Sequence, residues 1–332
     1  MRAASVQRTG GPEVLEVRDV PDPHPGPGQL VVEVDAAGVN FIDTYQRSGV
    51  YPVQPPFGVG LEGAGRVVEV GDGVGEDLGP GRLVAWKQAP GSCAERVLVE
   101  AAEAVPVPDG VDAETAAALM LQGLTAQYLC SATYAVRPGD AVVVHAAAGG
   151  VGLLLTQMVV LRGGRVLATT STPEKAELAR AAGADEVLAY EGFAARAREL
   201  TDGEGVAAVF DGVGRATFAE GLDALRPRGV MVLFGGASGQ VEPLDVQDLN
   251  AKGSLYVTRP SLAAYTRTRA ELEERAEQVL GWAATGALDV RVGGRYDLDD
   301  VARAHEDLEA RRTTGKLLVL PGGPAEAELG RS

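Results

Sequence analysis

Several glycines lie between an apolar strand and a helix. Their spacing is suited to binding a ligand through the backbone. The stretch VVVHAAAGGVGLLLTQM (142–158) reads as a strand, a tight turn and a helix. Gly149 would let backbone approach a pyrophosphate, Gly152 would allow close helix–strand packing, and the helix N-terminus offers N–H donors. Ala147 replaces the usual first glycine, but the strand–helix context is intact. The stretch predicts a dinucleotide site that includes Gly149, Gly150, Val151 and Gly152.

Hydroxyl groups and one ammonium follow the next strand, where NAD-binding proteins usually place a carboxylate. That carboxylate accepts bonds from the ribose 2′-hydroxyl of NAD, whereas a cation suits the 2′-phosphate of NADP. Here Thr170 and Ser171 can donate hydrogen bonds, and Lys175 supplies positive charge. Tyr190, at the end of the following strand, would flank the same pocket. We therefore expect NADPH as the cofactor.

The same segment also has the residues of a helix start. Thr172 is a good N-cap, Pro173 suits the first helical position, and Glu174 complements the helix dipole. On this interpretation Lys175 is only a solvated helix residue. The two interpretations are compatible, and the missing carboxylate favours a phosphate site.

The overall charge means that an anionic ligand needs a local positive site. The 332 residues carry a formal net charge of −16, which disfavours nucleic acid and anionic membranes as partners. Apolar runs fall short of the roughly 18 residues of a membrane span, and the chain starts without an apolar signal segment, so we expect a cytoplasmic protein. Two cysteines, Cys93 and Cys130, are too few for a disulfide framework or a four-cysteine zinc site.

Two patterns divide the chain. The first 120 or so residues read as short strands between Gly/Pro turns, which indicates an all-β region. Residues 112–130, DAETAAALMLQGLTAQYLC, predict one long helix. Apolar strands without alternation then alternate with helices, which predicts an α/β fold with a doubly wound parallel sheet. The six predicted strands cover residues 141–146, 165–170, 185–190, 206–213, 229–236 and 253–258. A glycine turn can join strand and helix without binding a ligand, but its place in this series favours binding.

Four separate motifs occur in an order typical of one known family. They are GVNFIDTYQRSGVYP (38–52), AAAGGVG (146–152), FGGASG (234–239) and GSLYVTRPSL (253–262). With them the chain resembles the zinc-independent quinone oxidoreductases, the zeta-crystallin-like branch of the medium-chain dehydrogenase/reductase superfamily. The resemblance extends from Gly11 to about Pro321.

The resemblance implies two domains with different folds. A GroES-like β domain would comprise residues 1–123 and 262–321, and a Rossmann domain with a six-stranded sheet would comprise residues 124–261. We expect residues 322–332 to form a disordered tail. In the resembled family the last Rossmann strand, here GSLYV, joins two subunits, which predicts a homodimer.

A metal-free site is expected because the zinc ligands of the superfamily are replaced. Zinc members carry a cysteine in the turn after the strand AAGV and a Gly-His-Glu near GLEGAG. Asn40 stands in that turn here, and Leu61 precedes Glu62. Without the thiolate and the imidazole, tetrahedral zinc lacks its ligand set. The histidines, which lie elsewhere, are His24, His145 and His305.

The function implied is NADPH-dependent reduction of a quinone. Without a metal, the developing oxyanion needs hydrogen-bond donors. The candidates are Asn40, with an amide, and Tyr45 and Tyr51, with hydroxyls and flat faces for a planar substrate. Alternatively, the two tyrosines only pack a small loop.

Further cofactor contacts are implied by the resemblance alone. Gln122 stands where relatives can have a lysine, which weakens a charge-based role there, and Arg311 would reach the 2′-phosphate or its rim. On the alternative interpretation, the glycines only form loops, the serine only caps a helix and the arginines are only solvated. The residues expected along the cofactor are Gln122, Thr125, Phe234, Gly235, Gly236, Ser238, Val257, Thr258, Arg259 and Arg311.

Two other functions remain open on the same scaffold. An NADPH-dependent enoyl or alkenal reductase also needs hydride delivery beside a donor loop. A non-enzymatic NADPH-binding sensor would need no donor loop, and the intact NFIDTY segment argues against it.

Overall fold

The computed structural model describes residues 1–323, which form two compact units. Unit 1 contains Met1–Leu121 and the chain from Thr268 onward, and unit 2 is Gln122–Arg267. Each unit has a hydrophobic core of its own. Most of the predicted disordered tail, residues 324–332, lies outside the described residues.

Unit 2 contains the predicted parallel sheet. Its six strands lie in the order β11-β10-β9-β12-β13-β14, and every neighbouring pair is parallel. This order confirms the doubly wound fold. The strands are β9 (Ala141–Val144), β10 (Arg165–Thr169), β11 (Glu186–Leu188), β12 (Val206–Asp211), β13 (Leu225–Leu233) and β14 (Tyr256–Thr258).

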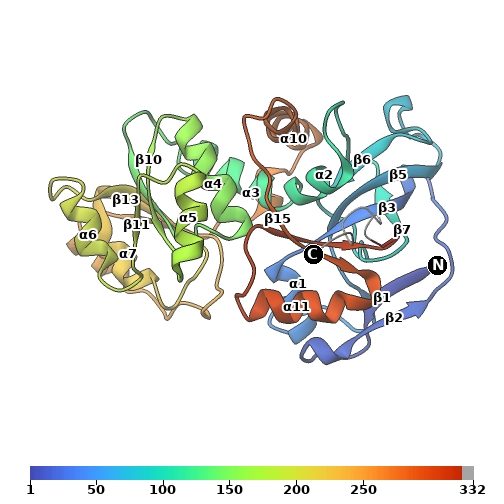
Figure 1. Cartoon of the computed structure of the whole chain (residues 1–332), viewed down its shortest axis with the longest axis horizontal. Helices are drawn as coiled ribbons and strands as arrows, with labels where there is room; N and C mark the ends of the chain where they lie inside the picture. The colour runs from blue at the N-terminus through green and yellow to red at the C-terminus, as the bar shows by residue number, and fades with distance from the viewer. Residues whose placement is uncertain (324–332) are drawn as a thin grey trace, which may run out of the picture. The chain divides into compact units, whose positions relative to one another are not determined.

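Helices cover both faces of this sheet. Figure 1 shows α4 (Gly150–Leu161) and α5 (Pro173–Ala181) on one face, and α6 (Phe193–Glu199) and α7 (Phe218–Ala224) on the other. The strand order reverses between β9 and β12, and ligands of such sheets bind where strands end at that point. The other α-helices of unit 2 are α3 (Gln122–Tyr128), α8 (Val246–Ala251) and α9 (Leu262–Tyr265).

Unit 1 is built on β-sheets into which the C-terminal strand is inserted. The larger sheet has the order β15-β16-β3-β5-β6-β8, and β7 also pairs with β3. A three-stranded sheet has the order β2-β1-β4. The strands are β1 (Arg2–Val6), β2 (Leu15–Asp19), β3 (Gln29–Val39), β4 (Phe57–Gly58), β5 (Glu62–Val70), β6 (Leu83–Trp86), β7 (Arg96–Glu100), β8 (Ala104–Pro106), β15 (Val292–Asp297) and β16 (Lys316–Leu320).

Within residues 1–323, unit 1 also has four α-helices that differ in length. In Figure 1, α11 lies near α1, and contacts between these two helices are present. The helices are α1 (Phe41–Ser48), α2 (Ala113–Leu119), α10 (Arg269–Ala284) and α11 (Val301–Glu309).

The prediction of one long helix over residues 112–130 is wrong in one respect. The structure has two helices there, with a turn between them. Met120 and Leu121 form a turn between α2 and α3, and a π-helical turn, Leu129–Thr133, follows α3. The Leu121 N–H donates to Glu62 Oε2 at 2.5 Å instead of continuing the helical hydrogen-bond series. A buried carboxylate from a distant strand thus ends the helix, which the local Ala/Leu pattern cannot predict.

Candidate functional site

The glycine turn between β9 and α4 is open at one glycine and tightly packed at another. A Cβ on Gly149 would meet only the Ala146 carbonyl oxygen, at 3.2 Å. A Cβ on Gly152 would lie 2.4 Å from that oxygen and 2.7 Å from Ala147 Cα. Gly152 therefore allows helix and strand to pack closely, whereas Gly149 leaves space beside the backbone. No side chain caps α4 within the described chain, so its first N–H groups stay available to an anion.

Gln122 is brought to this turn by the packing of α3 against α4. A Cβ on Gly150 would lie 1.7 Å from Gln122 Oε1, so the Gln122 side chain packs directly against this glycine and would have to move for a larger residue. Thr125, one turn further along α3, is buried. Gln122 therefore lies beside the turn, and a contact of Thr125 with the cofactor stays a prediction.

The segment after β10 has the predicted helix start. Thr172 is the N-cap of α5, and its hydroxyl accepts the Lys175 N–H at 3.3 Å. Thr170 and Lys175 are half-buried, and Ser171 is exposed. Backbone and Thr172 hydroxyl hydrogen bonds hold the pKa of Glu174 below its usual range. The capping interpretation is confirmed.

Tyr190 contacts the glycine turn directly. Its hydroxyl accepts the Ala146 N–H at 3.1 Å, and its ring stacks on His145 with the centroids 6.0 Å apart. His145 Nδ1 and Thr169 Oγ1 are 2.8 Å apart, which ties the ends of β9 and β10 together. Burial lowers the pKa of His145 to about 4, so the imidazole is neutral near pH 7. His145 is thus a buried, hydrogen-bonded residue at the end of the apolar strand.

A second loop pair, after β12 and β13, is organised by a carboxylate that the sequence analysis missed. Asp211 is fully buried, and its Oδ1 accepts the N–H groups of Val213 at 2.7 Å and Gly214 at 2.9 Å. Its Oδ2 accepts the Thr217 hydroxyl at 2.8 Å. An aspartate directly before a glycine at the end of an apolar strand, as in VFDGVG, is the signal that could have identified it.

The FGGASG segment packs on that loop. A Cβ on Gly235 would lie 2.4 Å from the Gly212 carbonyl oxygen, and Ser238 Oγ donates to Val213 O at 2.7 Å. Phe234 and Gly236 lie in the same half-buried segment. Among the residues predicted further along the chain, Arg259 Nη1 donates to Leu233 O at 3.2 Å. Val257, in β14, is paired with Met231 of β13.

Arg311 belongs to unit 1 and is therefore not among the residues that unit 2 brings together. It follows α11 in a left-handed backbone conformation, with φ of 55°. Its proposed contact with a 2′-phosphate stays a prediction.

In unit 1, α1 brings the predicted substrate residues together. Tyr45, on α1, and Tyr51, just after it, have ring centroids 5.3 Å apart at 63°. The Tyr51 N–H donates to Tyr45 O at 3.0 Å, and Gly49, with φ of 83°, makes the turn between them. Tyr51 is 37% exposed, so its hydroxyphenyl group lies at the surface of the unit.

Asn40, at the N-terminus of α1, lies in a buried polar cluster. Its Nδ2 donates to Glu62 Oε1 at 2.6 Å, and its Oδ1 accepts from Lys316 Nζ at 2.9 Å. Lys316 Nζ also donates to Glu62 Oε1. Nδ2 also donates to Gly38 O at 3.5 Å, so a donor role of Asn40 toward a substrate would have to replace this weaker bond.

Asp43 extends this cluster and is its titratable member near neutral pH. It is 4% exposed, and its Oδ2 accepts the Asn40 N–H at 2.7 Å. Burial raises the pKa of Asp43 to about 7, against the lowering effects of the Asn40 hydrogen bond and the Lys316 charge. The sequence analysis did not include Asp43 or Lys316 in the site.

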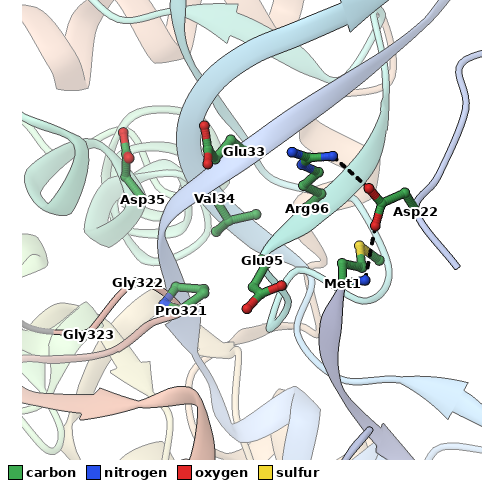
Figure 2. Close-up of a pocket in the computed structure, with 10 residues that line it drawn as sticks. All are labelled: Met1, Asp22, Glu33, Val34, Asp35, Glu95, Arg96, Pro321, Gly322 and Gly323. Carbon is green, nitrogen blue, oxygen red and sulfur yellow. Dashed lines mark hydrogen bonds and ion pairs between the residues drawn. The ribbon is translucent and has the colours of Figure 1, made fainter. Parts of the chain in front are cut away.

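A cavity of about 560 Å³ in unit 1 differs chemically from these regions (Figure 2). Asp22 binds the Met1 ammonium at 3.0 Å and Arg96 at 2.7 Å, as the dashed lines show. Burial holds the pKa of Asp35 above its usual range. Four carboxylates against two cationic groups would repel an anionic dinucleotide. The lining residues are Met1, Asp22, Glu33, Val34, Asp35, Glu95, Arg96, Pro321, Gly322 and Gly323.

Neither a metal cluster nor a membrane-spanning helix is found in residues 1–323. No three His, Cys, Asp or Glu side chains of this part gather into a group that could hold a metal. Its helices are all too short or too polar to cross a bilayer.

Comparison with known proteins identifies both halves of the chain. Residues 26–138 match the alcohol dehydrogenase GroES-like domain, and residues 150–280 match the zinc-binding dehydrogenase family. The chain is 46% identical to the quinone oxidoreductase of Pseudomonas aeruginosa over 94% of this chain and 97% of that protein. It is 40% identical to the 2-haloacrylate reductase of a Burkholderia species over 96% of this chain and 98% of that protein.

A solved structure gives the same result for the fold. The quinone oxidoreductase of Escherichia coli, solved with NADPH, matches with a TM-score of 0.94 at 42% identity. The match covers 97% of this chain and all of the other. This chain therefore belongs to the quinone oxidoreductase family.

Proposed function

We propose that this protein is an NADPH-dependent quinone reductase. The observation that carries the proposal is the full-length match to a quinone oxidoreductase solved with NADPH. The chemistry of unit 2 agrees, because the end of β10 offers hydroxyls and the Lys175 ammonium where an NAD site would have a carboxylate.

Unit 2 supplies the groups that a dinucleotide needs. The open space at Gly149 and the uncapped N-terminus of α4 suit a pyrophosphate, since backbone N–H groups and the helix dipole attract anions. We propose that Thr170, Ser171 and Lys175 hold the 2′-phosphate and that Tyr190 flanks it. The FGGASG loop, Val257 and Arg259 would line the remainder, with Gln122 and Thr125 on the other side of the turn.

Unit 1 supplies the donors for the substrate. NADPH, when bound, supplies the hydride that a quinone accepts. We propose that the Tyr45 and Tyr51 hydroxyls donate hydrogen bonds to the quinone oxygen as negative charge develops on it. The two rings also offer apolar faces to a planar ring. A proton from solvent completes the hydroquinone.

One relative favours a second candidate function. The Burkholderia 2-haloacrylate reductase is named for a substrate with a carbon–carbon double bond conjugated to a carboxylate, and it is 40% identical to this chain. Reduction of an activated alkene is therefore the alternative. A sensor that binds NADPH without turnover is the third candidate function.

An acceptor panel separates the three functions. NADPH oxidation would be followed with 1,4-benzoquinone, 2-chloroacrylate and an α,β-unsaturated aldehyde, each also with NADH. We expect kcat/KM for benzoquinone with NADPH to exceed that of the other acceptors by roughly tenfold or more. Faster turnover of 2-chloroacrylate would favour the alternative, and NADPH binding without any turnover would favour the sensor.

We also propose a homodimer formed through β14. This strand is at the end of the sheet, and Tyr256 on it is 61% exposed. Exposed edge strands pair readily with another strand. A solution mass equal to that of one chain would contradict the dimer.

A cytoplasmic location is proposed as well, and it agrees with Cys93 and Cys130 being buried as free thiols.

A further inference from the structure

A buried ion pair stands at the start of the helix that carries Tyr45. Asn40, Glu62 and Lys316 are each no more than 3% exposed. We infer that Lys316 is a positioning residue for the reduction: through the Asn40 amide, its ammonium fixes the first turn of α1 and hence Tyr45. The inference rests on the proposed function.

The topology of unit 1 brings the two residues together. Lys316 is the first residue of β16, and Asn40 directly follows the last residue of β3. These strands are antiparallel, with Leu317 opposite Val39. The lysine and the asparagine therefore meet at the same end of the strand pair, although 276 positions separate them in the sequence.

The buried Lys316 ammonium is paired and hydrogen-bonded, as a buried charge must be to avoid a large cost in stability. Glu62 Oε1 accepts from Lys316 and from Asn40, and Glu62 Oε2 accepts the Leu121 N–H at 2.5 Å. Removal of the lysine alone would leave a buried carboxylate without its cation. Removal of both charges would avoid that penalty, so folding and positioning can be tested separately.

The Asn40 amide is held at both ends, and this fixes the beginning of α1. Its oxygen accepts from Lys316, its nitrogen donates to Glu62, and its backbone N–H donates to Asp43 Oδ2 at 2.7 Å. Asp43 is the third residue of α1, and Tyr45 follows two residues later. A rotation of the amide would therefore be transmitted to the first turn and to the tyrosine beyond it.

Lys316 also acts on Asp43 through its charge. Asp43 faces Glu62 from β5, Lys316 from β16 and the Cys93 thiol, whose pKa burial and Asp43 together raise. Lys316 lowers the pKa of Asp43, and Glu62 raises it. Loss of Lys316 alone should move the pKa of Asp43 upward, whereas loss of both charges should move it less. A lysine that only filled space would not have this effect.

The test uses the full-length protein with 1,4-benzoquinone and NADPH. The variants are Lys316→Met, Asn40→Ala, Lys316→Met with Asn40→Ala, and Lys316→Met with Glu62→Gln. We expect Lys316→Met and Asn40→Ala each to lower kcat about tenfold, with NADPH Kd within twofold of wild type. The variant with both substitutions should lose no more kcat than either single variant, because both substitutions act through the same Asn40 amide. Lys316→Met with Glu62→Gln should regain thermal stability while kcat stays low.

A matched control and an NMR measurement complete the design. Lys87→Met removes another buried lysine of unit 1, which pairs with Glu103 at 2.5 Å, and should lower Tm with kcat within twofold. The ¹³C carboxyl titration of Asp43 should shift upward in Lys316→Met. Two outcomes would overturn this inference without affecting the proposed function. One is recovery of both kcat and Tm in Lys316→Met with Glu62→Gln. The other is an additive loss of kcat when Lys316→Met is combined with Asn40→Ala. A wild-type protein that does not reduce benzoquinone would overturn the proposed function and this inference together.

Discussion

The glycine turn of unit 2 and the buried cluster of unit 1 are built by opposite means. The turn uses backbone and the absence of side chains, since Gly149 leaves space where any other residue would place a Cβ. The cluster uses charged side chains that are almost completely buried, Glu62 and Lys316. The turn is assembled within about 50 residues of sequence, from His145 to Tyr190, whereas Glu62 and Lys316 are 254 positions apart.

This difference predicts how substitutions in each region should affect stability and ligand binding. A side chain added to the turn should act through steric overlap, and the consequence should depend on which glycine it replaces. A charge removed from the cluster should act through electrostatics, and the consequence should depend on pH. Substitutions in the two regions should therefore separate these two behaviours.

Gly152→Ala should have the largest effect on stability. Its Cβ would lie 2.4 Å from the Ala146 carbonyl oxygen, which is backbone and cannot move without shifting the strand end. We expect the free energy of unfolding to fall by about 3 kcal/mol, as measured by urea denaturation.

Gly149→Ala is the matched control, because its Cβ would meet only the Ala146 oxygen at 3.2 Å. It should cost less than about 1 kcal/mol of stability, yet lower NADPH affinity by roughly tenfold or more, because the methyl group takes space proposed for the pyrophosphate. Wild-type NADPH binding by Gly149→Ala would show that the pyrophosphate does not lie at this turn.

Lys175→Ala should separate the two cofactors. A charge-assisted hydrogen bond is worth about 1.5–3 kcal/mol, so NADPH Kd should rise by roughly 10–100-fold. NADH, which lacks the 2′-phosphate, should bind as before. Titration of both cofactors measures this, with Lys252→Ala as the control, since Lys252 is another lysine of unit 2 and pairs with Asp223. An equal loss of affinity for both cofactors would contradict the phosphate role.

The fold and the turn were accessible from the sequence because their signals are local. Apolar runs predicted the six parallel strands, and the glycines between β9 and α4 marked the turn. The NFIDTY segment grouped Asn40 and Tyr45 in a small loop, whereas the structure has a helix there, α1, with Asn40 as its N-cap. Each of these signals lies within a few residues of the feature that it predicts.

The cluster could not be predicted in the same way, because it depends on tertiary pairing. Lys316 reads as an ordinary polar residue before the apolar strand LLVL, and only the pairing of β16 with β3 brings it to Asn40. The interruption of the helix at Leu121 has the same origin, since Glu62 comes from a strand 59 positions earlier. The sequence pattern was right about the strands of the parallel sheet, but it lacked the distant partners that end or position other elements.

Asp43→Asn should change how stability depends on pH. The folded-state pKa of Asp43 is raised to about 7, so protonation stabilises the fold fully below the unfolded-state pKa of about 4. That stabilisation is lost as pH rises through the folded pKa. The free energy of unfolding of Asp43→Asn minus that of wild type should therefore increase from pH 4 to 7, by on the order of 1 kcal/mol per pH unit.

The difference measurement is needed because two buried histidines act in the opposite direction. Burial lowers the pKa of His145 to about 4 and of His305 to about 3. Their stabilising effect is present above about pH 6.5 and is lost as pH falls through these values. They are present in both proteins and cancel in the difference. A difference that stays constant with pH would show that Asp43 does not titrate in this range.

Tyr190→Phe should have the smallest effect and tests whether side chains contribute to the turn at all. It removes the hydroxyl that accepts the Ala146 N–H at 3.1 Å but keeps the ring that stacks on His145. Ala146 is exposed, so water can replace the lost acceptor and stability should fall by less than about 1 kcal/mol. NADPH affinity should fall by no more than about threefold, measured with NADH in parallel. A loss as large as that of Gly149→Ala would mean that the Tyr190 hydroxyl, rather than backbone alone, sets the conformation of the turn.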